Sequence, residues 1–180
     1  MSDLAAQYQA LARYNTWMNE RLYALCATLP DEMRKEDRGA FFRSVHGTLN
    51  HLLLADRAWL GRFTRDAALA QSRDGNGNPI AYTGKLDQEV YADFALLRRE
   101  RATTDAAIEA WAAGLTAEHL AAPFSYRSSA GQRYDHPLWW AVIHFFNHQT
   151  HHRGQLTTLL TQLGHDSGVT DLVSLLREPS

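Results

Sequence analysis

Four of the nine histidines lie in one short segment, residues 144–155, which reads HFFNHQTHHRGQ. His144, His148 and His152 are spaced four residues apart, and His151 directly precedes the last of them. If the segment is helical, side chains four residues apart lie on one face, one turn above the other. Two imidazoles at that spacing reach one metal ion from the same side, although spacing alone does not decide between the first pair and the second. A zinc-type ion needs three or four ligands, so at least one more must come from elsewhere.

The best candidate for a further ligand is His51, in the apolar stretch HGTLNHLLLADRAWL. A histidine on one helix that faces a pair on another is how helical bundles build metal sites in their cores. Three histidines leave one coordination position open for water or substrate, as a catalytic site requires. A single inward histidine is more often a hydrogen-bonded core residue, but several imidazoles buried together are costly without a common partner. The cluster therefore favours a metal site.

Asp56 and Arg153 are the two candidates for a catalytic role. Asp56 lies in the apolar stripe of the same segment as His51, so it needs a partner: a backbone group, an arginine or the free nitrogen of a metal-bound histidine. Arg153 directly follows the histidine pair and is either an anion-binding group or a surface arginine. The sequence HQTHH does not predict a zinc protease, because Gln149 stands where the HExxH motif has its glutamate base. We expect His46 to lie at the surface or in a loop.

Four long segments show apolar residues at spacings of three and four, which is typical of amphipathic helices. We place these helices roughly at residues 4–25, 41–63, 87–113 and 137–163, with Gly164 ending the last one. Four such helices predict an all-α fold, an antiparallel four-helix bundle with a three-histidine metal site in its core.

The connections are long. Residues 71–85 are rich in Gly, Asn and Pro and predict an exposed loop, while residues 123–137 have the pattern of a small hairpin. The run from Arg98 to Arg101 reads as a solvated helix face. Gly154 indicates a close neighbouring helix, within the chain or between subunits. The apolar residues 170–176 predict a short C-terminal helix.

Length, composition and charge limit the number of domains, the class of partner and the cellular compartment. At 180 residues, with 45% hydrophobic and 21% charged residues, we expect a single domain over residues 1–180. A net charge of −2 gives no indication of nucleic-acid binding. The single cysteine, Cys26, excludes an internal disulfide and fits a reducing compartment. Because we see neither a secretory signal nor a membrane-length apolar stretch, we expect a cytoplasmic protein that does not bind membranes.

The chain resembles the DinB family of bacterial metal-binding helical proteins, which is distinct from the DNA polymerase of the same name. The resemblance rests on NHLLLADRAWL around His51 and on HPLWWAVIHFFNHQTHHRGQL around His148 and His152. It implies a four-helix bundle, commonly a homodimer, with one divalent metal ion, zinc or nickel, held by three histidines. Carried onto this chain, the implied ligands are His51, His148 and His152. His144 and His151 then become neighbours of the site.

Some relatives in that family transfer a low-molecular-weight thiol, such as bacillithiol or mycothiol, onto a small-molecule electrophile. The resemblance therefore implies a metal-dependent thiol S-transferase in stress response or detoxification, with the nucleophile supplied by the cosubstrate. A metal with an open position holds a thiol as thiolate at neutral pH. Two alternatives stay open: a metal-dependent hydrolase, with Asp56 as its base, and a non-catalytic stress protein that the metal stabilises.

Overall fold

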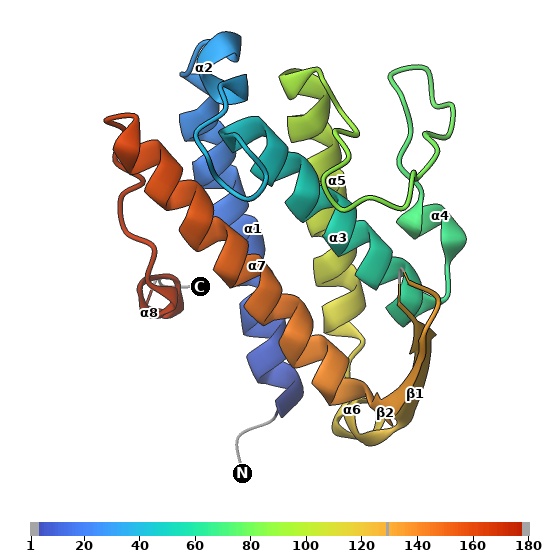
Figure 1. Cartoon of the computed structure of the whole chain (residues 1–180). Coiled ribbons are helices and arrows are strands. Elements are labelled where there is room, and N and C mark those ends of the chain that lie inside the picture. Colours follow the sequence, from blue (N-terminus) through green and yellow to red (C-terminus); the bar gives the residue numbers. More distant parts are fainter. Residues whose placement is uncertain (1–3, 129, 178–180) are drawn as a thin grey trace.

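The computed structural model describes residues 4–128 and 130–177, and four long helices form its framework (Figure 1). Helix α1 packs against α5 and α7, and α3 packs against the same two helices, so the core lies between all four. The long helices are α1 (Leu4–Ala27), α3 (Val45–Thr64), α5 (Phe94–Ala113) and α7 (Leu138–Gln162). The shorter elements are α2 (Asp31–Lys35), α4 (Ala67–Ala70), α6 (Ala117–Ala121), β1 (Pro123–Arg127), β2 (Arg133–Pro137) and α8 (Leu172–Leu176).

A two-stranded antiparallel sheet accompanies the helices, so the expectation of an all-α chain is correct only for the main framework. Strands β1 and β2 pair with Phe124 opposite His136 and Tyr126 opposite Tyr134. This is the hairpin predicted from the Ser/Gly turn within residues 123–137. Figure 1 shows it beside the C-terminal half of α3, on the same side as α4. Its position matters because Tyr126 and Tyr134 of the hairpin line a cleft that also contains His51 and His148.

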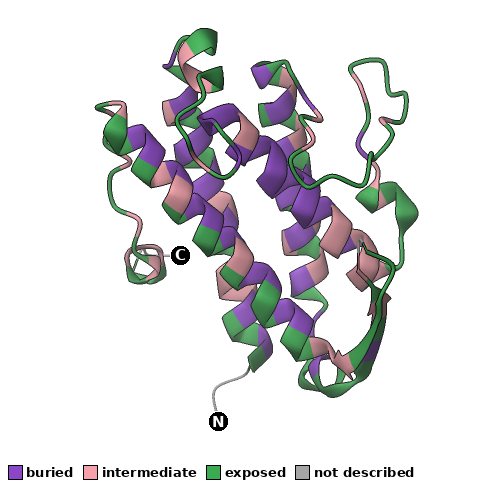
Figure 2. Cartoon of the chain, in the orientation of Figure 1, coloured by how far each residue is buried: buried purple, intermediate pink, exposed green. Residues whose placement is uncertain are grey.

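Helix α3 begins at Val45 and not at Phe41, because a tight turn precedes it. Arg43 adopts a left-handed conformation with φ 65°, and its N–H donates to the carbonyl of Ala40. The side chain of Ser44 then accepts a hydrogen bond from the N–H of Gly47 at 3.0 Å, which caps the helix. From this start the helix runs through the interior, and Figure 2 shows buried residues along much of its length.

Helix α5 begins at Phe94 and not near Asp87, because tertiary hydrogen bonds hold the residues before it in an extended path. The N–H of Tyr91 donates to Asn50 Oδ1 at 2.8 Å, and its carbonyl accepts from His46 Nε2 at 2.7 Å. Since these groups are already bonded to α3, they are not available to a helical turn. Asp93 caps the helix, and His46 is fully buried instead of lying at the surface.

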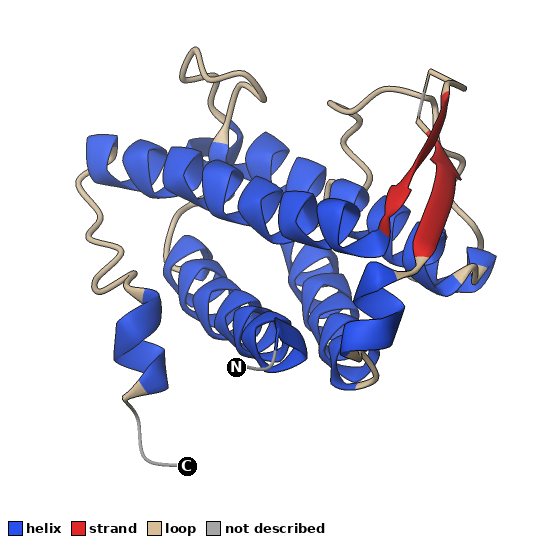
Figure 3. Ribbon diagram, turned by 90° about the horizontal axis from the view of Figure 1, so that it is seen from below, coloured by secondary structure: helices blue, strands red, loops and turns tan. Residues whose placement is uncertain are grey.

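The C-terminal part follows the prediction closely. Gly164, with φ 82°, ends α7 in the left-handed conformation that glycine adopts without strain, and α8 then packs against α1. Figure 3 shows α8 at the end of the molecule opposite the hairpin. Gly154 has no neighbour within 4 Å of where a Cβ would lie, so no other helix of the part of the chain that the structure describes approaches it closely. No helix among the described residues is both long and apolar enough to cross a membrane.

Candidate metal centre

Three histidines from two helices converge on one point. His51 comes from α3, while His148 and His152 come from successive turns of α7. The Nε2 atom of His51 lies 3.3 Å from that of His148 and 3.2 Å from that of His152, and the last two are 3.1 Å apart. Among the described residues these three form the group of side chains that could hold a metal ion.

The second ring nitrogens settle which atoms carry protons. His51 Nδ1 lies 2.9 Å from the carbonyl oxygen of Leu86, and a carbonyl only accepts, so Nδ1 carries the hydrogen. His152 Nδ1 lies 2.8 Å from Gln155 Oε1 and donates to it in the same way. The amide nitrogen of Gln155 faces His151 Nε2 at 3.3 Å, which supports this orientation of the amide. Both Nε2 atoms therefore present lone pairs to the centre of the cluster.

A divalent metal fits this arrangement. Nitrogen lone pairs that face one another at close range repel. A cation between them removes this repulsion, because each lone pair then binds the cation. Metal–nitrogen bonds of about 2.0–2.1 Å in tetrahedral geometry place ligand atoms about 3.3–3.4 Å apart, close to the three distances in the structure. Burial lowers the pKa of His51 to about 4, and burial together with the imidazoles of His152 and His51 lowers the pKa of His148 to about 3. Both are therefore neutral at physiological pH, as metal ligands must be.

Phe42 covers one side of the cluster. Its ring stacks on His51 with the centroids 3.8 Å apart and an interplanar angle of 15°, and it meets His152 edge-on at 5.4 Å. Gly47 permits this contact, because a Cβ at that position would lie 2.1 Å from the carbonyl oxygen of Phe42. The turn before α3 can therefore approach the first turn of the helix and place an aromatic ring on a ligand.

The two catalytic candidates lie beneath the cluster, in the core. Asp56 is 1% exposed, and its Oδ2 accepts from Arg101 Nη1 at 2.7 Å. Arg101 also pairs with Asp105 at 2.8 Å, so it is buried between two carboxylates and does not belong to the solvated helix face that we expected. Arg153 is 4% exposed and donates to the side-chain oxygen of Asn15 on α1. The partner that Asp56 requires is thus an arginine.

His144 and His151 lie outside the cluster, as neighbours of it. His144 is exposed, and its ring lies 5.9 Å from that of His148 and 5.2 Å from that of Trp59. His151 is exposed and contacts the ring of His152 at 4.9 Å. The geometry therefore selects His148 and His152, and not His144 and His148, as the pair that meets His51.

A cleft of about 770 Å³ opens beside the cluster, and His51 and His148 line one end of it. Its walls come from α3, α4, the loop after α4, the hairpin and α7. The sequence did not indicate it, because these segments are far apart in the chain. Its other lining residues are Leu54, Ala55, Ala58, Trp59, Arg62, Ala67, Ala70, Gln71, Ser72, Ile80, Ala81, Tyr82, Leu86, Gln88, Val90, Tyr126, Ser128, Tyr134 and His144.

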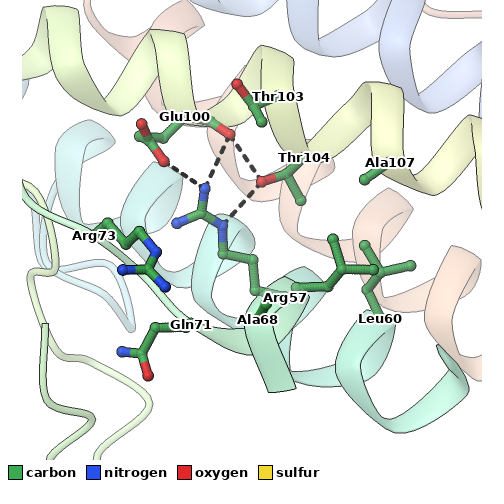
Figure 4. A pocket seen from close by; sticks show the side chains of 10 residues that line it. Arg57, Leu60, Ala68, Gln71, Arg73, Glu100, Thr103, Thr104 and Ala107 are labelled. Carbon is green, nitrogen blue, oxygen red and sulfur yellow. Dashed lines mark hydrogen bonds and ion pairs between the residues drawn. The ribbon is translucent and has the colours of Figure 1, made fainter. Parts of the chain in front are cut away.

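Arg57 holds the loop that forms one wall of this cleft. It lies beside a smaller cavity of about 170 Å³ between α3, α4 and α5 (Figure 4). Its guanidinium donates to Glu100 at 2.7 Å and to Thr104 at 3.0 Å on α5, and to Tyr91 at 2.8 Å and Ser72 at 3.2 Å in the loop. One buried cation thereby ties the loop that carries Leu86 to two helices.

Comparison with known proteins gives a consistent result. The sequence model of the DinB family matches residues 1–179. Protein DinB of Bacillus subtilis (strain 168) is 27% identical over 178 residues, which cover 95% of this chain and 92% of that protein. The crystal structure of a DinB-like protein from Bacillus cereus ATCC 10987 aligns with a TM-score of 0.56 at 20% identity, over 83% of this chain and 87% of the other. At that identity, the structural likeness shows a shared fold alone.

Proposed function

Because the chain belongs to the DinB family, we propose that it binds one divalent metal ion, zinc or nickel, and transfers a low-molecular-weight thiol onto a small electrophile in stress response or detoxification. The observation that carries this proposal is the convergence of three imidazole nitrogens at one end of a large cleft. Three nitrogen ligands leave a coordination position for a reactant, and the cleft gives a small molecule access to it.

Each residue of the site has a distinct task. His51, His148 and His152 hold the ion, and the Leu86 carbonyl and Gln155 fix the rings of the first and third of these. A bound divalent metal supplies a positive centre that lowers the pKa of a thiol near it. Phe42 covers the cluster on one side, and the cleft leaves His51 and His148 accessible on another.

The sulfur must come from a cosubstrate. Cys26 is fully buried in the core, and burial raises the pKa of its thiol to about 12, so it does not act as a nucleophile. In the transfer, the cosubstrate sulfur loses its proton to solvent and forms a bond to an electrophilic carbon. The leaving group departs from that carbon with the bonding electron pair.

A hydrolase has less support. It needs a base next to the water-binding position, and Asp56, the carboxylate that we considered for this task, is paired with Arg101 in the core and does not line the cleft. The non-catalytic alternative, in which the metal only stabilises the fold, does not account for the large cleft beside the histidines.

The test measures metal content by mass spectrometry on tag-free protein, for the wild type, His148→Ala and His144→Ala. The last is a matched control, since it removes an exposed histidine one turn earlier on the same helix. We expect near-stoichiometric metal in the wild type and the control, and loss in His148→Ala. Thiol consumption is then followed with several electrophiles in the metal-loaded protein. Equal metal content in all three proteins would refute the site, and no metal-dependent thiol consumption would refute the transferase.

A further inference from the structure

The positive charge in the cleft comes from Arg62, near the C-terminal end of α3. On α3, the residues that face the cleft form a single stripe from His51 through Ala55 and Ala58 to Arg62. Among the described residues that line the cleft, Arg62 is the one arginine or lysine, and no aspartate or glutamate accompanies it. A cleft with an unbalanced positive group is suited to an anionic ligand.

The surroundings of Arg62 leave its polar edge available. Its Cζ lies 4.7 Å from the ring centroid of Trp59 and 5.5 Å from that of Tyr126, so aromatic rings are close to the flat guanidinium. In residues 4–128 and 130–177, no carboxylate lies within 4.0 Å of its nitrogens. The buried arginines Arg57 and Arg101 differ in this respect, because each has a carboxylate partner. Arg62 is therefore half-buried without a carboxylate partner among the described residues.

The position of Arg62 sets the length of a ligand that reaches both it and the histidines. Arg62 lies eleven positions after His51 on α3, which is about three helical turns and roughly 16 Å along the axis. Side chains on a helix lean towards its N-terminus, which displaces His51 and Arg62 in the same direction and keeps their ends about as far apart as their positions on the helix. The rings of Trp59, His144 and His148 follow one another along this path at 5.2 and 5.9 Å. A ligand that spans it is elongated, on the order of 10 Å.

We propose that the cleft binds an elongated carboxylate-bearing molecule, whose acid group pairs with Arg62 while its body lies along Trp59 and its other end reaches the three histidines. A carboxylate accepts two parallel hydrogen bonds from the edge of a guanidinium, and among the described residues no carboxylate already occupies that of Arg62. The acid belongs either to the thiol or to the electrophile. The reactive end of the ligand, but not the pairing with Arg62, rests on the proposed function.

Calorimetric titration of the full chain, both as purified and after chelation, tests the pairing. One arm uses S-methylglutathione and its diethyl ester, which represent an acidic thiol with its sulfur blocked. The other uses 6-phenylhexanoate and its amide, which represent an acidic apolar electrophile. Each probe is titrated into the wild type, Arg62→Gln, Arg62→Lys and the control Arg98→Gln, which changes an exposed arginine on α5 outside the cleft.

In at least one arm, we expect the acid to bind the wild type about tenfold or more tightly than its neutral counterpart. Arg62→Gln should abolish this preference, Arg62→Lys should retain part of it, and Arg98→Gln should leave it unchanged. The arm that shows the preference identifies the source of the acid. The proposal is overturned if neither acid is preferred, or if the preference survives in Arg62→Gln. Because the chelated protein is included, a failure to bind metal or to consume thiol leaves this result interpretable.

Discussion

At the scale of single residues, Gly47, one turn before His51 on α3, shows how a position that makes no bond to the cluster acts on one of its histidines. The absence of a side chain there lets the Phe42 carbonyl approach α3, and the Phe42 ring in turn lies flat on His51. This dependence could not be predicted from the sequence, because nothing in the local pattern distinguishes Gly47 from a glycine that is merely tolerated in a helix. The grouping of the histidines could be predicted, because several imidazoles at helical spacing among apolar residues are rare.

We expect Gly47→Ala to destabilise the protein by about 1–3 kcal/mol, since the new methyl group overlaps the Phe42 carbonyl and forces the turn to move. Metal affinity should decrease with it, as Phe42 leaves His51. Urea unfolding and metal titration measure the two effects. Gly154→Ala is the matched control: the space there is open, so the same change in a helix interior should stabilise by about 1 kcal/mol. Equal behaviour of the two variants would contradict this account.

His46 predicts a pH dependence of stability. Burial lowers its pKa below the ordinary value of 6.5, so the folded chain keeps it neutral where the unfolded chain protonates it. The stability it contributes is therefore present above pH 6.5 and is lost as the pH decreases below that value, by up to about 1.4 kcal/mol per pH unit. In metal-free protein, the free energy of unfolding should decline less steeply for His46→Gln than for the wild type. Parallel curves would show that His46 does not contribute.

At the scale of elements, the sequence predicted the four long helices and the hairpin, since periodicity and turn residues are local signals. It misplaced the start of α5 because the backbone of Tyr91 bonds to side chains of α3, which is a tertiary effect. It also assigned Arg101 to the surface within a run of charges. A signal was available there, because Arg101 is four residues after Leu97 and seven before Ile108, and both of these are fully buried.

Arg101 joins α5 to α3 through a buried ion pair, and its removal leaves Asp56 and Asp105 without their countercharge. We expect Arg101→Ala to cost about 3–5 kcal/mol of stability in urea unfolding. Arg99→Ala should cost at most about 1 kcal/mol, because Arg99 is exposed and its contact with Glu100 is long, at 3.6 Å. Adding Asp105→Asn to Arg101→Ala should restore part of the loss. A similar loss of stability in Arg101→Ala and Arg99→Ala would show that the buried ion pairs contribute no more than the exposed one.

At the scale of the whole molecule, a metal held by the three histidines would crosslink α3 to α7, two parts of the chain that are distant in sequence. Since the unfolded chain lacks the site, binding should stabilise the fold by about 4 kcal/mol at a free metal concentration a thousand times the Kd. Chelation should lower the melting temperature of the wild type and leave that of His148→Ala unchanged. A melting temperature that does not respond to chelation in the wild type would contradict a metal at this site.

The homodimer that the family resemblance implies is a prediction at the same scale. Trp140 and Ile143, 53% and 51% exposed, place large apolar side chains near the start of α7. We expect Ile143→Asp to shift a dimer towards monomer in analytical ultracentrifugation. Val173→Asp, which changes an exposed residue of α8, should not. A dimer that withstands Ile143→Asp would exclude this face as the interface.

The contact between His51 and the Leu86 carbonyl has a consequence for how such a protein diversifies. The oxygen that orients the ligand belongs to the main chain, so any amino acid at position 86 supplies it as long as the loop keeps its path. The side chain of Leu86, half-exposed and part of the cleft wall, is under no such constraint. If the chain acts as proposed, a mutation at this position can therefore change the shape of the cleft and with it the substrate preference, while the orientation of His51 is kept.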